Sequence, residues 1–365
     1  MIHNVYLHFP FCLRKCGYCS FYSINYTRES SEDYIRYVVD EINAYSTLIA
    51  IKPQTLYFGG GTPSLMTLDQ VVRVMDCFDL SELAECTLEA NPATIERKKL
   101  AELKAHGVNR LSIGFQSFRD RELQFLERLH TSEDNYRVFR IARDSGFDNI
   151  SVDLMFGLPG QRLEDLVKSI DAIMELNPEH ISTYCLSIED ATPFARKGVK
   201  LPADEITARF YRYIRERLQD DGYEQYEISN FSRRGYMSQH NLNYWHNSKF
   251  IGFGVSAHSN IGDFRYHNPS NMKDYCSLQQ DDRLYPNRED LDKLEQRKEF
   301  IINALRLSKG LDIEKFNRLF ATSFCQIYQK SLEKHNKFLV IENGFLKLKP
   351  DAYFVSNEII MDFID

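Results

Sequence analysis

The sequence has few cysteines, no surplus of basic charge and no long apolar run, and each shortage excludes a class of protein. Its 8 cysteines among 365 residues are too sparse for a disulfide-rich scaffold. Acidic residues outnumber basic ones by 52 to 45, so the net charge of −7 provides no overall basic field for a nucleic-acid backbone. No apolar run approaches the roughly 20 residues that cross a bilayer. We therefore expect no nucleic-acid partner and no membrane span.

The first residues also lack the pattern of a secretory signal. Residues 1–4 contain no basic n-region, and Pro10 and Cys12 interrupt any apolar h-region. A cytoplasmic location is therefore expected, where cysteines stay reduced. With 43% hydrophobic and 27% charged residues, the chain has enough apolar material to bury a large core.

Through most of the chain, short apolar runs of strand length alternate with segments of helical periodicity. The expected strands are residues 5–9, 55–58, 85–89, 110–114, 149–155 and 180–187. The expected helices are residues 31–49, 67–78, 94–106, 132–145, 163–176 and 203–220. Such alternation predicts an α/β fold with a parallel sheet. Six βα units are too few for a closed eight-stranded barrel, so we predict a partial (β/α)6 barrel, similar to a TIM barrel, with its site at the carboxyl ends of the strands.

The pattern changes twice along the chain and divides it into three regions. Residues 1–230 form the predicted barrel core. A stretch rich in Gly, Asn and His begins there, so residues 231–290 are predicted to be an irregular extension. Residues 291–365 are predicted to form a small C-terminal domain, helical and similar to a winged helix. Its expected elements are helices at residues 293–307 and 313–320 and a hairpin of residues 338–341 and 345–348 around Asn343 and Gly344.

Three cysteines, Cys12, Cys16 and Cys19, form a C-x3-C-x2-C array on the loop that leaves the first predicted strand. Thiolates at this spacing can ligate three irons of one [4Fe-4S] cluster and leave the fourth iron free for another ligand. A structural zinc site is the competing interpretation, but it usually needs a fourth nearby Cys or His, and none follows here. The other five cysteines are scattered singly, and we expect them to be small apolar core residues.

Together with its flanking motifs, this array resembles the radical S-adenosylmethionine superfamily. The matching segments are residues 6–12 (YLHFPFC), 58–63 (FGGGTP), 89–92 (EANP), 109–116 (NRLSIGFQ) and 153–159 (DLMFGLP). They are similar to the branch that contains oxygen-independent coproporphyrinogen dehydrogenases (HemN) and HemW heme chaperones. The resemblance implies that the free iron binds the amino and carboxylate groups of S-adenosylmethionine. It also implies that one electron from the reduced cluster cleaves the sulfonium to give a 5′-deoxyadenosyl radical.

Glycines and polar residues near the ends of the predicted strands are candidates to bind S-adenosylmethionine. Residues 59–61 are glycines whose amides can approach a polar ligand, although a tight βα turn explains them equally well. Glu89, Gln116 and Asp153 lie where an isolated carboxylate or amide is costly to bury. The resemblance maps these residues onto contacts with S-adenosylmethionine: Tyr6, Gly60, Gly61, Thr62, Glu89, Gln116, Arg128, Asp153 and Ser187. It directs the carboxylates toward the amine or ribose and Arg128 toward the ligand carboxylate. For each residue alone, a structural hydrogen bond is the alternative.

A second motif, HNLNYW at residues 240–245, contains the single tryptophan of the chain and is typical of HemW-like proteins. An imidazole beside two large aromatic rings can ligate heme iron while the rings cover the macrocycle, which makes His240 the candidate heme ligand. Alternatively, Tyr244 and Trp245 belong to the core and His240 bonds to the backbone. Without the resemblance this alternative is favoured, because a lone histidine is weak evidence. His258 is a second candidate close to heme.

Two functions compete within the family, namely heme delivery and radical decarboxylation of coproporphyrinogen III, so enzymatic activity stays open. We favour a heme chaperone because the cluster motif begins at Cys12, without the long N-terminal extension of the dehydrogenases. Phe21 also stands where they carry another cysteine, and the motif of residues 240–245 is present. The predicted partners are heme or porphyrinogen, apo-hemoproteins such as respiratory cytochromes, and an electron donor. The strand edges of a partial barrel also allow a homodimer.

Overall fold

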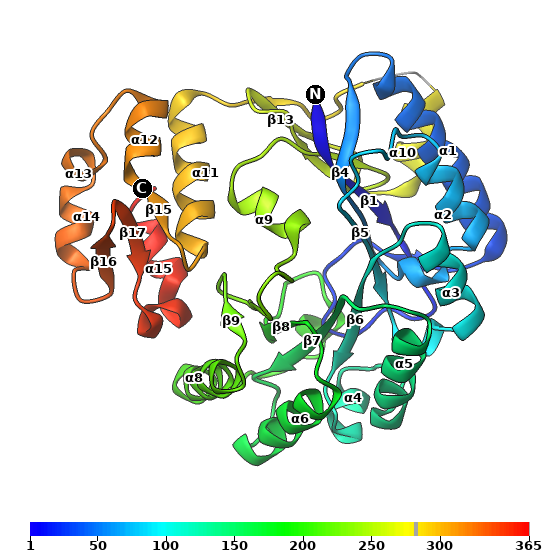
Figure 1. Cartoon of the computed structure of the whole chain (residues 1–365), viewed down its shortest axis with the longest axis horizontal. Helices are drawn as coiled ribbons and strands as arrows, with labels where there is room; N and C mark the ends of the chain where they lie inside the picture. The colour runs from blue at the N-terminus through cyan, green and yellow to red at the C-terminus, as the bar shows by residue number, and fades with distance from the viewer. Residues whose placement is uncertain (281–283, 365) are drawn as a thin grey trace.

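The computed structural model describes residues 1–280 and 284–364 and contains the curved parallel sheet that the sequence predicts (Figure 1). Among these residues the largest sheet has nine strands. In spatial order they are β11 (Ile251–Phe253), β1 (Ile2–Phe9), β4 (Ile51–Gly60), β5 (Glu85–Ala90), β6 (Arg110–Gln116), β7 (Ile150–Phe156), β8 (His180–Cys185), β10 (Asn230–Ser232) and β9 (Glu224–Gln225). The strands from β1 to β8 in this order pair in parallel. The partial (β/α)6 barrel is therefore confirmed.

Helices cover the outer face of the sheet (Figure 1). The longer ones are α1 (Arg28–Ser46), α2 (Leu68–Met75), α3 (Arg97–Ala105), α5 (Ser132–Asp144), α6 (Leu163–Leu176) and α8 (Asp204–Asp220). Shorter ones are η1 (Pro63–Leu65), η2 (Pro92–Thr94), α4 (Asp120–Phe125) and α7 (Pro193–Arg196). Helix α6 spans the predicted residues, because Leu166, Ile170 and Ile173 recur at helical spacing and are buried on one face.

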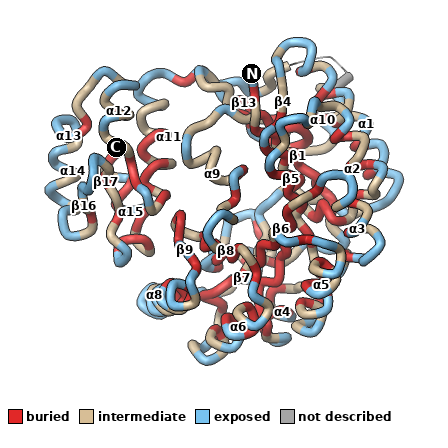
Figure 2. Tube along the Cα trace, in the orientation of Figure 1, coloured by how far each residue is buried: buried red, intermediate tan, exposed pale blue. Residues whose placement is uncertain are grey.

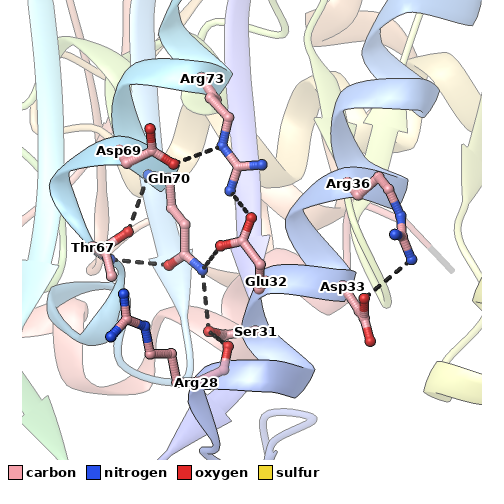
Figure 3. Close-up of polar contacts among 9 residues, drawn as sticks. All are labelled: Arg28, Ser31, Glu32, Asp33, Arg36, Thr67, Asp69, Gln70 and Arg73. Atoms are coloured by element: carbon pink, nitrogen blue, oxygen red, sulfur yellow. Dashed lines mark hydrogen bonds and ion pairs between the residues drawn. The ribbon is translucent and has the colours of Figure 1, made fainter.

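A network of polar contacts holds α1 against α2 outside the sheet (Figure 3). Thr67 and Gln70 cap α2 reciprocally: the Gln70 amide N donates to Thr67 Oγ1 at 3.2 Å, and the Thr67 amide N donates to Gln70 Oε1 at 3.0 Å. The buried Gln70 side chain then donates to Ser31 Oγ at 3.2 Å and to Glu32 Oε2 at 3.1 Å on α1. Arg73 also pairs with Glu32. These contacts fix α2, which follows the glycine-rich end of β4.

Along the central strands, side chains alternate between the outer core and the barrel interior. On β6, Leu111, Ile113 and Phe115 belong to the apolar core. Ser112 and Gln116 point to the other face and line the cavity described below. Figure 2 shows that these strands are the most buried part of the molecule. One face of each strand is therefore used for stability and the other is available for a site.

Residues 224–290 extend both edges of the sheet. Strands β10 and β9 continue it antiparallel beyond β8, and β11 pairs in parallel with β1. Helix α9 (Gln239–Trp245) lies between the barrel and the C-terminal region (Figure 1). The remaining elements are β12 (His258–Asn260), β13 (Phe264–His267), α10 (Met272–Gln280) and β14 (Glu289–Asp290). Residues 281–283 of the predicted extension lie outside the described residues, as does Asp365 at the end of the predicted C-terminal domain.

The C-terminal region combines helices with a small antiparallel sheet. Its elements are α11 (Lys293–Arg306), β15 (Leu311–Asp312), α12 (Ile313–Phe320), α13 (Phe324–Ile327), α14 (Gln329–Lys334), β16 (Leu339–Glu342), β17 (Phe345–Leu348), η3 (Pro350–Val355) and α15 (Ser356–Met361). The predicted hairpin is present, and both turn residues, Asn343 and Gly344, have the positive φ that a tight turn requires. In the part of the chain that the structure describes, no helix has the length and apolarity to cross a bilayer.

Candidate functional site

A cavity of about 410 Å³ opens at the carboxyl ends of the central strands. Its volume lies within the range of small-molecule sites. The residues predicted from the sequence that line it are Cys12, Cys16, Cys19, Gly60, Gly61, Thr62, Glu89, Gln116, Arg128, Asp153 and Ser187. The fold therefore gathers side chains from successive βα units at one end of the barrel.

The cysteine loop leaves β1 and is closed by a short parallel pair, β2 (Phe11–Cys12) with β3 (Ile24–Asn25). Its three cysteines are half-buried free thiols. Two donors point at their sulfur atoms from neighbouring loops: Thr62 Oγ1 donates to Cys12 Sγ at 3.5 Å, and Arg128 Nη1 donates to Cys16 Sγ at 3.6 Å. These are donors that stabilise sulfur in its thiolate form, which is the form that ligates a metal.

The glycine loop after β4 approaches the cysteine loop so closely that it has no room for a side chain. A Cβ at Gly61 would lie 2.7 Å from Phe11 O and 3.0 Å from Cys12 Sγ. The Gly61 amide donates to Phe9 O at 2.7 Å, and this hydrogen bond holds the glycine loop against the end of β1, where the cysteine loop begins. Gly60 has φ of 113°, a conformation open to glycine alone. The donor set and this close approach fit a cluster bound at the cysteines with a polar ligand over the glycine loop.

Glu89 lies at the end of β5 and faces the glycine loop. Its Oε1 accepts a hydrogen bond from Tyr57 OH at 2.8 Å, and its Oε2 accepts one from the Gly60 amide at 3.1 Å. Burial, with a further contribution from the negative charge of Asp153, raises the pKa of Glu89 to about 7. A cationic ligand beside this carboxyl would favour its ionised form.

Asp153 on β7 is the second carboxyl of the cavity. Ser112 Oγ donates to its Oδ1 at 3.4 Å. Burial raises the pKa of Asp153 to about 6, against the opposing effect of the Arg110 and Arg128 guanidinium groups. Arg110 is itself buried, and its Nε has no hydrogen-bond partner. The cavity therefore combines the carboxyls of Glu89 and Asp153 with the guanidinium of Arg128, an arrangement suited to a zwitterionic ligand.

Arg128 and Gln116 form the wall beside β6. Arg128 Nη2 donates to Gly114 O at 2.7 Å, which holds the guanidinium over the cavity while Nη1 reaches Cys16. Gln116 has φ of 66°, a left-handed conformation that costs roughly 1–3 kcal/mol in a residue with a side chain. Such strain at the end of a strand is common in binding sites. Ser187 lies exposed at the cavity mouth.

Comparison with known proteins agrees with this geometry. The radical SAM superfamily model matches residues 6–173, and the HemN C-terminal domain model matches residues 291–355. The heme chaperone HemW of Bacillus subtilis (strain 168) is 34% identical over 97% of this chain and 95% of its own length. HemW of Lactococcus lactis subsp. lactis (strain IL1403) is 31% identical over 99% of this chain and 97% of its own. The chain belongs to the HemW-like branch of the radical SAM superfamily.

A solved structure supports the fold of this HemW-like chain. Coproporphyrinogen III oxidase (HemN) from Escherichia coli, a radical SAM enzyme, superposes with a TM-score of 0.88 at 23% identity. The match covers 99% of this chain and 90% of that chain, so both the barrel and the C-terminal region share its fold. Membership of the radical SAM superfamily implies a [4Fe-4S] cluster and S-adenosylmethionine as cofactors.

Neither Tyr6 nor His240 is among the described residues that line the cavity of the HemW-like chain. Tyr6 OH donates to His8 Nδ1 at 3.1 Å, and its ring stacks on Tyr57 at 6.0 Å between centroids. Because Tyr57 in turn donates to Glu89, Tyr6 lies one side chain behind the cavity wall. Its contact with a ligand in the cavity would run through Tyr57.

His240 is an interior residue with only 1% of its surface exposed. Thr55 Oγ1 donates its single hydrogen to Asn4 Oδ1 at 3.2 Å. The same hydroxyl oxygen therefore accepts a hydrogen bond from His240 Nδ1 at 2.8 Å. His240 Nε2 then accepts from Tyr244 OH at 2.8 Å. Burial lowers the pKa of His240 to about 3, which keeps the ring neutral. Both ring nitrogens are therefore engaged within the protein.

The rest of the HNLNYW motif joins the barrel to the C-terminal region. Asn243 Nδ2 donates to Asn4 Oδ1 at 2.5 Å on β1. On the other side of α9, the Arg306 guanidinium of α11 lies over the Trp245 ring at 4.7 Å. The motif residues thus make structural contacts in both directions.

Four residues that shape the cavity are absent from the sequence predictions: Tyr18, Tyr57, Ser112 and Tyr184. Ser112 lies four positions before Gln116 on the same face of β6, so the two-residue period of a strand, counted back from Gln116, would have found it. Tyr57 becomes evident only through its bond to Glu89, 32 positions away. Tyr18 and Tyr184 have no distinguishing pattern in the sequence.

Proposed function

We propose that this chain binds a [4Fe-4S] cluster through Cys12, Cys16 and Cys19, holds S-adenosylmethionine beside it, and carries heme to apo-hemoproteins. The observation that carries the cluster and cofactor part is the contact between the cysteine and glycine loops at Gly61, which opens one cavity to both. The heme part is supported by full-length similarity to proteins named heme chaperone HemW. The proposal includes a cytoplasmic location, a reductant for the cluster, and recipients such as respiratory cytochromes.

The residues around the cavity have complementary tasks in this proposal. When bound, the cluster supplies an electron and one open iron position. Gly60, Gly61 and Thr62 present backbone and hydroxyl groups to the methionine end of the cofactor. Glu89 attracts the amine, and Arg128 attracts the carboxylate while donating to Cys16 Sγ.

The nucleoside end would lie toward the opposite wall of the cavity. Asp153 accepts hydrogen bonds from the ribose hydroxyls, and Gln116 and Ser187 border the same space. Tyr6 supports Glu89 through Tyr57 without reaching the ligand itself. Because the carboxyls are buried and protonate readily, they hold a cationic ligand most tightly after losing their protons.

Anaerobic reconstitution tests the cluster and cofactor. Wild-type protein should contain iron and sulfide, and its reduced cluster should change its EPR spectrum when S-adenosylmethionine is added. Cys16→Ser should lose the cluster, whereas Cys325→Ser, at an exposed cysteine far from the motif, should keep it. Zinc in place of iron, or an EPR spectrum indifferent to S-adenosylmethionine, would contradict the proposal.

The same preparation tests the heme function. Hemin titration should saturate at a defined stoichiometry, and bound heme should pass to an apo-cytochrome. Incubation with coproporphyrinogen III under reducing conditions should yield no vinyl groups and no methionine. Vinyl formation without stable heme binding would assign the chain to the decarboxylase function instead.

A further inference from the structure

We propose that Arg110 is a positioning residue of the S-adenosylmethionine site: from the barrel interior, its guanidinium is the internal counter-charge of Glu89 and Asp153. This inference rests on the proposed cofactor and names a residue that serves the cofactor without touching it. Arg110 is not among the described residues that line the cavity. Its action on the ligand therefore runs through the two carboxyls.

Arg110 is the first residue of β6 and lies on the interior face of the sheet. It precedes Ser112 by two positions, so both side chains point into the barrel. The strands on either side are β5, which carries Glu89, and β7, which carries Asp153. In the register, Arg110 is opposite Thr87 and Ser112 is opposite Glu89. Arg110 therefore lies one interior position below Glu89, between the two strands that carry the carboxyls.

The guanidinium of Arg110 is enclosed without a direct partner. Only 2% of the residue is exposed, and within the described chain no hydrogen bond or ion pair engages it. Thr87, opposite it in the register, is fully buried, and its Oγ1 also lacks a partner. A buried guanidinium is costly unless an opposite charge compensates it. The compensation must therefore come from charges nearby rather than from a contact.

The groups around Arg110 are neutral except for two carboxyls. Its charge acts on six buried groups, which are Tyr57, Glu89, Asp153, His180, Tyr226 and His240. Burial, followed by the charge of Arg110, lowers the pKa of His180 and His240 and keeps both rings neutral. Burial raises the pKa of the two tyrosines, which stay phenols. The negative charges of the set are therefore Glu89 and Asp153.

A third carboxyl, Glu85, lies two positions before Thr87 on β5 but serves a different element. Its Oε1 accepts from the His240 amide at 3.0 Å, and its Oε2 accepts from the Gln239 amide at 2.9 Å. Both oxygens are thus directed to the start of α9. Backbone amides, rather than Arg110, compensate this carboxyl.

Of the two arginines near the cavity carboxyls, Arg110 is the one that acts on both. Arg128 acts on Asp153, but it also faces Cys16 and the proposed place of the ligand carboxylate. The other titratable groups that face Glu89 or Asp153 are Tyr6, Tyr18, Tyr57, Tyr184 and Tyr244. Burial raises the pKa of each of these phenols, so none supplies a positive charge.

A fixed positive charge below the cavity changes how the carboxyls meet a cation. Burial raises the pKa of both carboxyls, and Arg110 opposes this effect. Without Arg110, Glu89 and Asp153 would hold their protons to higher pH, and a cationic cofactor would meet neutral groups. Because the carboxyls line the cavity and Arg110 does not, their attraction for the cofactor acts over a shorter distance than its repulsion.

The test is calorimetric titration of the reconstituted full-length protein with S-adenosylmethionine between pH 5.5 and pH 8.5. Arg110→Met removes the charge and keeps an unbranched stem, whereas Arg110→Lys keeps the charge. We expect Arg110→Met to raise the pH midpoint of the affinity by about one unit. Binding should then be roughly tenfold weaker at pH 6 and less than about twofold weaker at pH 8.5. Arg110→Lys should restore the wild-type midpoint.

Arg215→Met is the matched control. It removes another buried guanidinium, which pairs with Asp351 at 3.6 Å in the C-terminal region, far from the cavity carboxyls. This variant should lower the stability of the fold and leave the pH midpoint of cofactor affinity unchanged.

A second measurement needs neither cluster nor cofactor. Infrared titration of the ligand-free protein follows the carbonyl bands of protonated carboxyls, and Glu89→Gln and Asp153→Asn assign the two bands. In Arg110→Met both bands should persist to higher pH than in wild type. If Arg110→Met does not fold, Arg110→Gln gives the same comparison with a neutral polar side chain.

The outcomes separate this inference from the proposed function. If wild-type protein binds no S-adenosylmethionine, the proposed function fails, while the infrared bands still show whether Arg110 acts on the carboxyls. If wild type binds and Arg110→Met keeps both its midpoint and its bands, the proposed function stands and this inference is overturned. A loss of affinity that is equal at every pH, or that Arg110→Lys does not restore, would show a merely structural role and equally overturn it.

Discussion

At the residue scale, the cavity depends on two carboxyls that are protonated more readily than usual. Glu89 bonds to Tyr57 and Gly60, and Asp153 bonds to Ser112, but burial raises the pKa of both. The cost of their ionisation is recovered only when a cation binds beside them. Ligand binding and proton release are therefore coupled.

We expect the affinity for S-adenosylmethionine to rise with pH between about 6 and about 7, the pKa values of Asp153 and Glu89. Calorimetric titration in two buffers of different ionisation enthalpy would measure the protons released. Glu89→Gln should weaken binding and reduce proton release. Glu122→Gln, at a buried carboxyl outside the cavity whose pKa is also raised, should leave both unchanged. Equal proton release by wild type and Glu89→Gln would contradict this expectation.

The raised pKa of Glu89 also makes the stability of the ligand-free protein depend on pH. Because the pKa of Glu89 is raised on folding, the folded chain holds this proton more tightly than the unfolded chain does. The stability that this proton contributes is complete below pH 4.5 and is lost as the pH rises toward 7. Urea unfolding at pH 5.5 and pH 7.5 should show a smaller pH-dependent loss of stability in Glu89→Gln than in wild type.

Residues were predictable where their chemistry is local in the sequence. Cys12, Cys16 and Cys19 lie within one loop, so their spacing alone indicated a shared ligand. His240 stays a predicted heme ligand, and the bond of its ring to Thr55, 185 positions away, is one that no local pattern in the sequence indicates. A histidine that bonds within the protein and one that binds metal look alike until the fold places their neighbours.

At the element scale, the cap of α2 sets the position of the glycine loop. Gln70 closes the capping box and also reaches α1, so one buried amide serves both helices (Figure 3). A helix so fixed keeps the preceding turn against the cysteine loop. Loss of the Gln70 side chain should therefore lower the stability of the fold more than it affects ligand binding in the cavity.

Gln70→Ala should lower the free energy of unfolding by about 1–3 kcal/mol, because the Thr67 amide loses its acceptor and Ser31 and Glu32 lose a donor. Arg36→Ala is the matched control: it breaks the exposed pair with Asp33 on α1 and should cost less than about 1 kcal/mol. Urea denaturation followed by circular dichroism measures both. Equal losses in the two variants would show that the network contributes no more than a surface ion pair.

Elements were predictable in proportion to their length. Helix α6 has enough turns for its apolar period to fix both ends. Strand β11 has three residues, Ile251–Phe253, too few for any period, and it is defined by pairing with β1. The stretch of residues 231–290 was therefore predicted as irregular although it holds short regular elements such as β11 and β12.

At the scale of the whole molecule, the barrel and the C-terminal region meet at α9. Asn303 Nδ2 donates to Asn247 Oδ1 at 2.8 Å, and the Ser308 amide donates to Tyr226 O at 3.0 Å. Trp245 lies under Arg306 at the same junction. The chain has one tryptophan, so its fluorescence reports on this junction alone.

We expect the fluorescence of Trp245 and the far-ultraviolet circular dichroism to change together during urea unfolding, because the contacts at the junction couple both regions. Arg306→Ala should alter the native fluorescence and move the fluorescence transition to lower urea than the dichroism transition. Lys293→Ala, at an exposed position on the same helix, should leave the two transitions together. An early fluorescence transition in wild type would show that the regions unfold independently.

The large sheet ends at β11 on one side and at β9 on the other, so within the described chain no ring of backbone hydrogen bonds fixes its circumference. A closed barrel has a diameter determined by strand number and stagger. Here the curvature can relax or tighten by small changes of twist between neighbours, with every ladder intact. The width of the interior is therefore an adjustable quantity, and a bulky planar guest could be accommodated by elastic bending of the wall rather than by local melting.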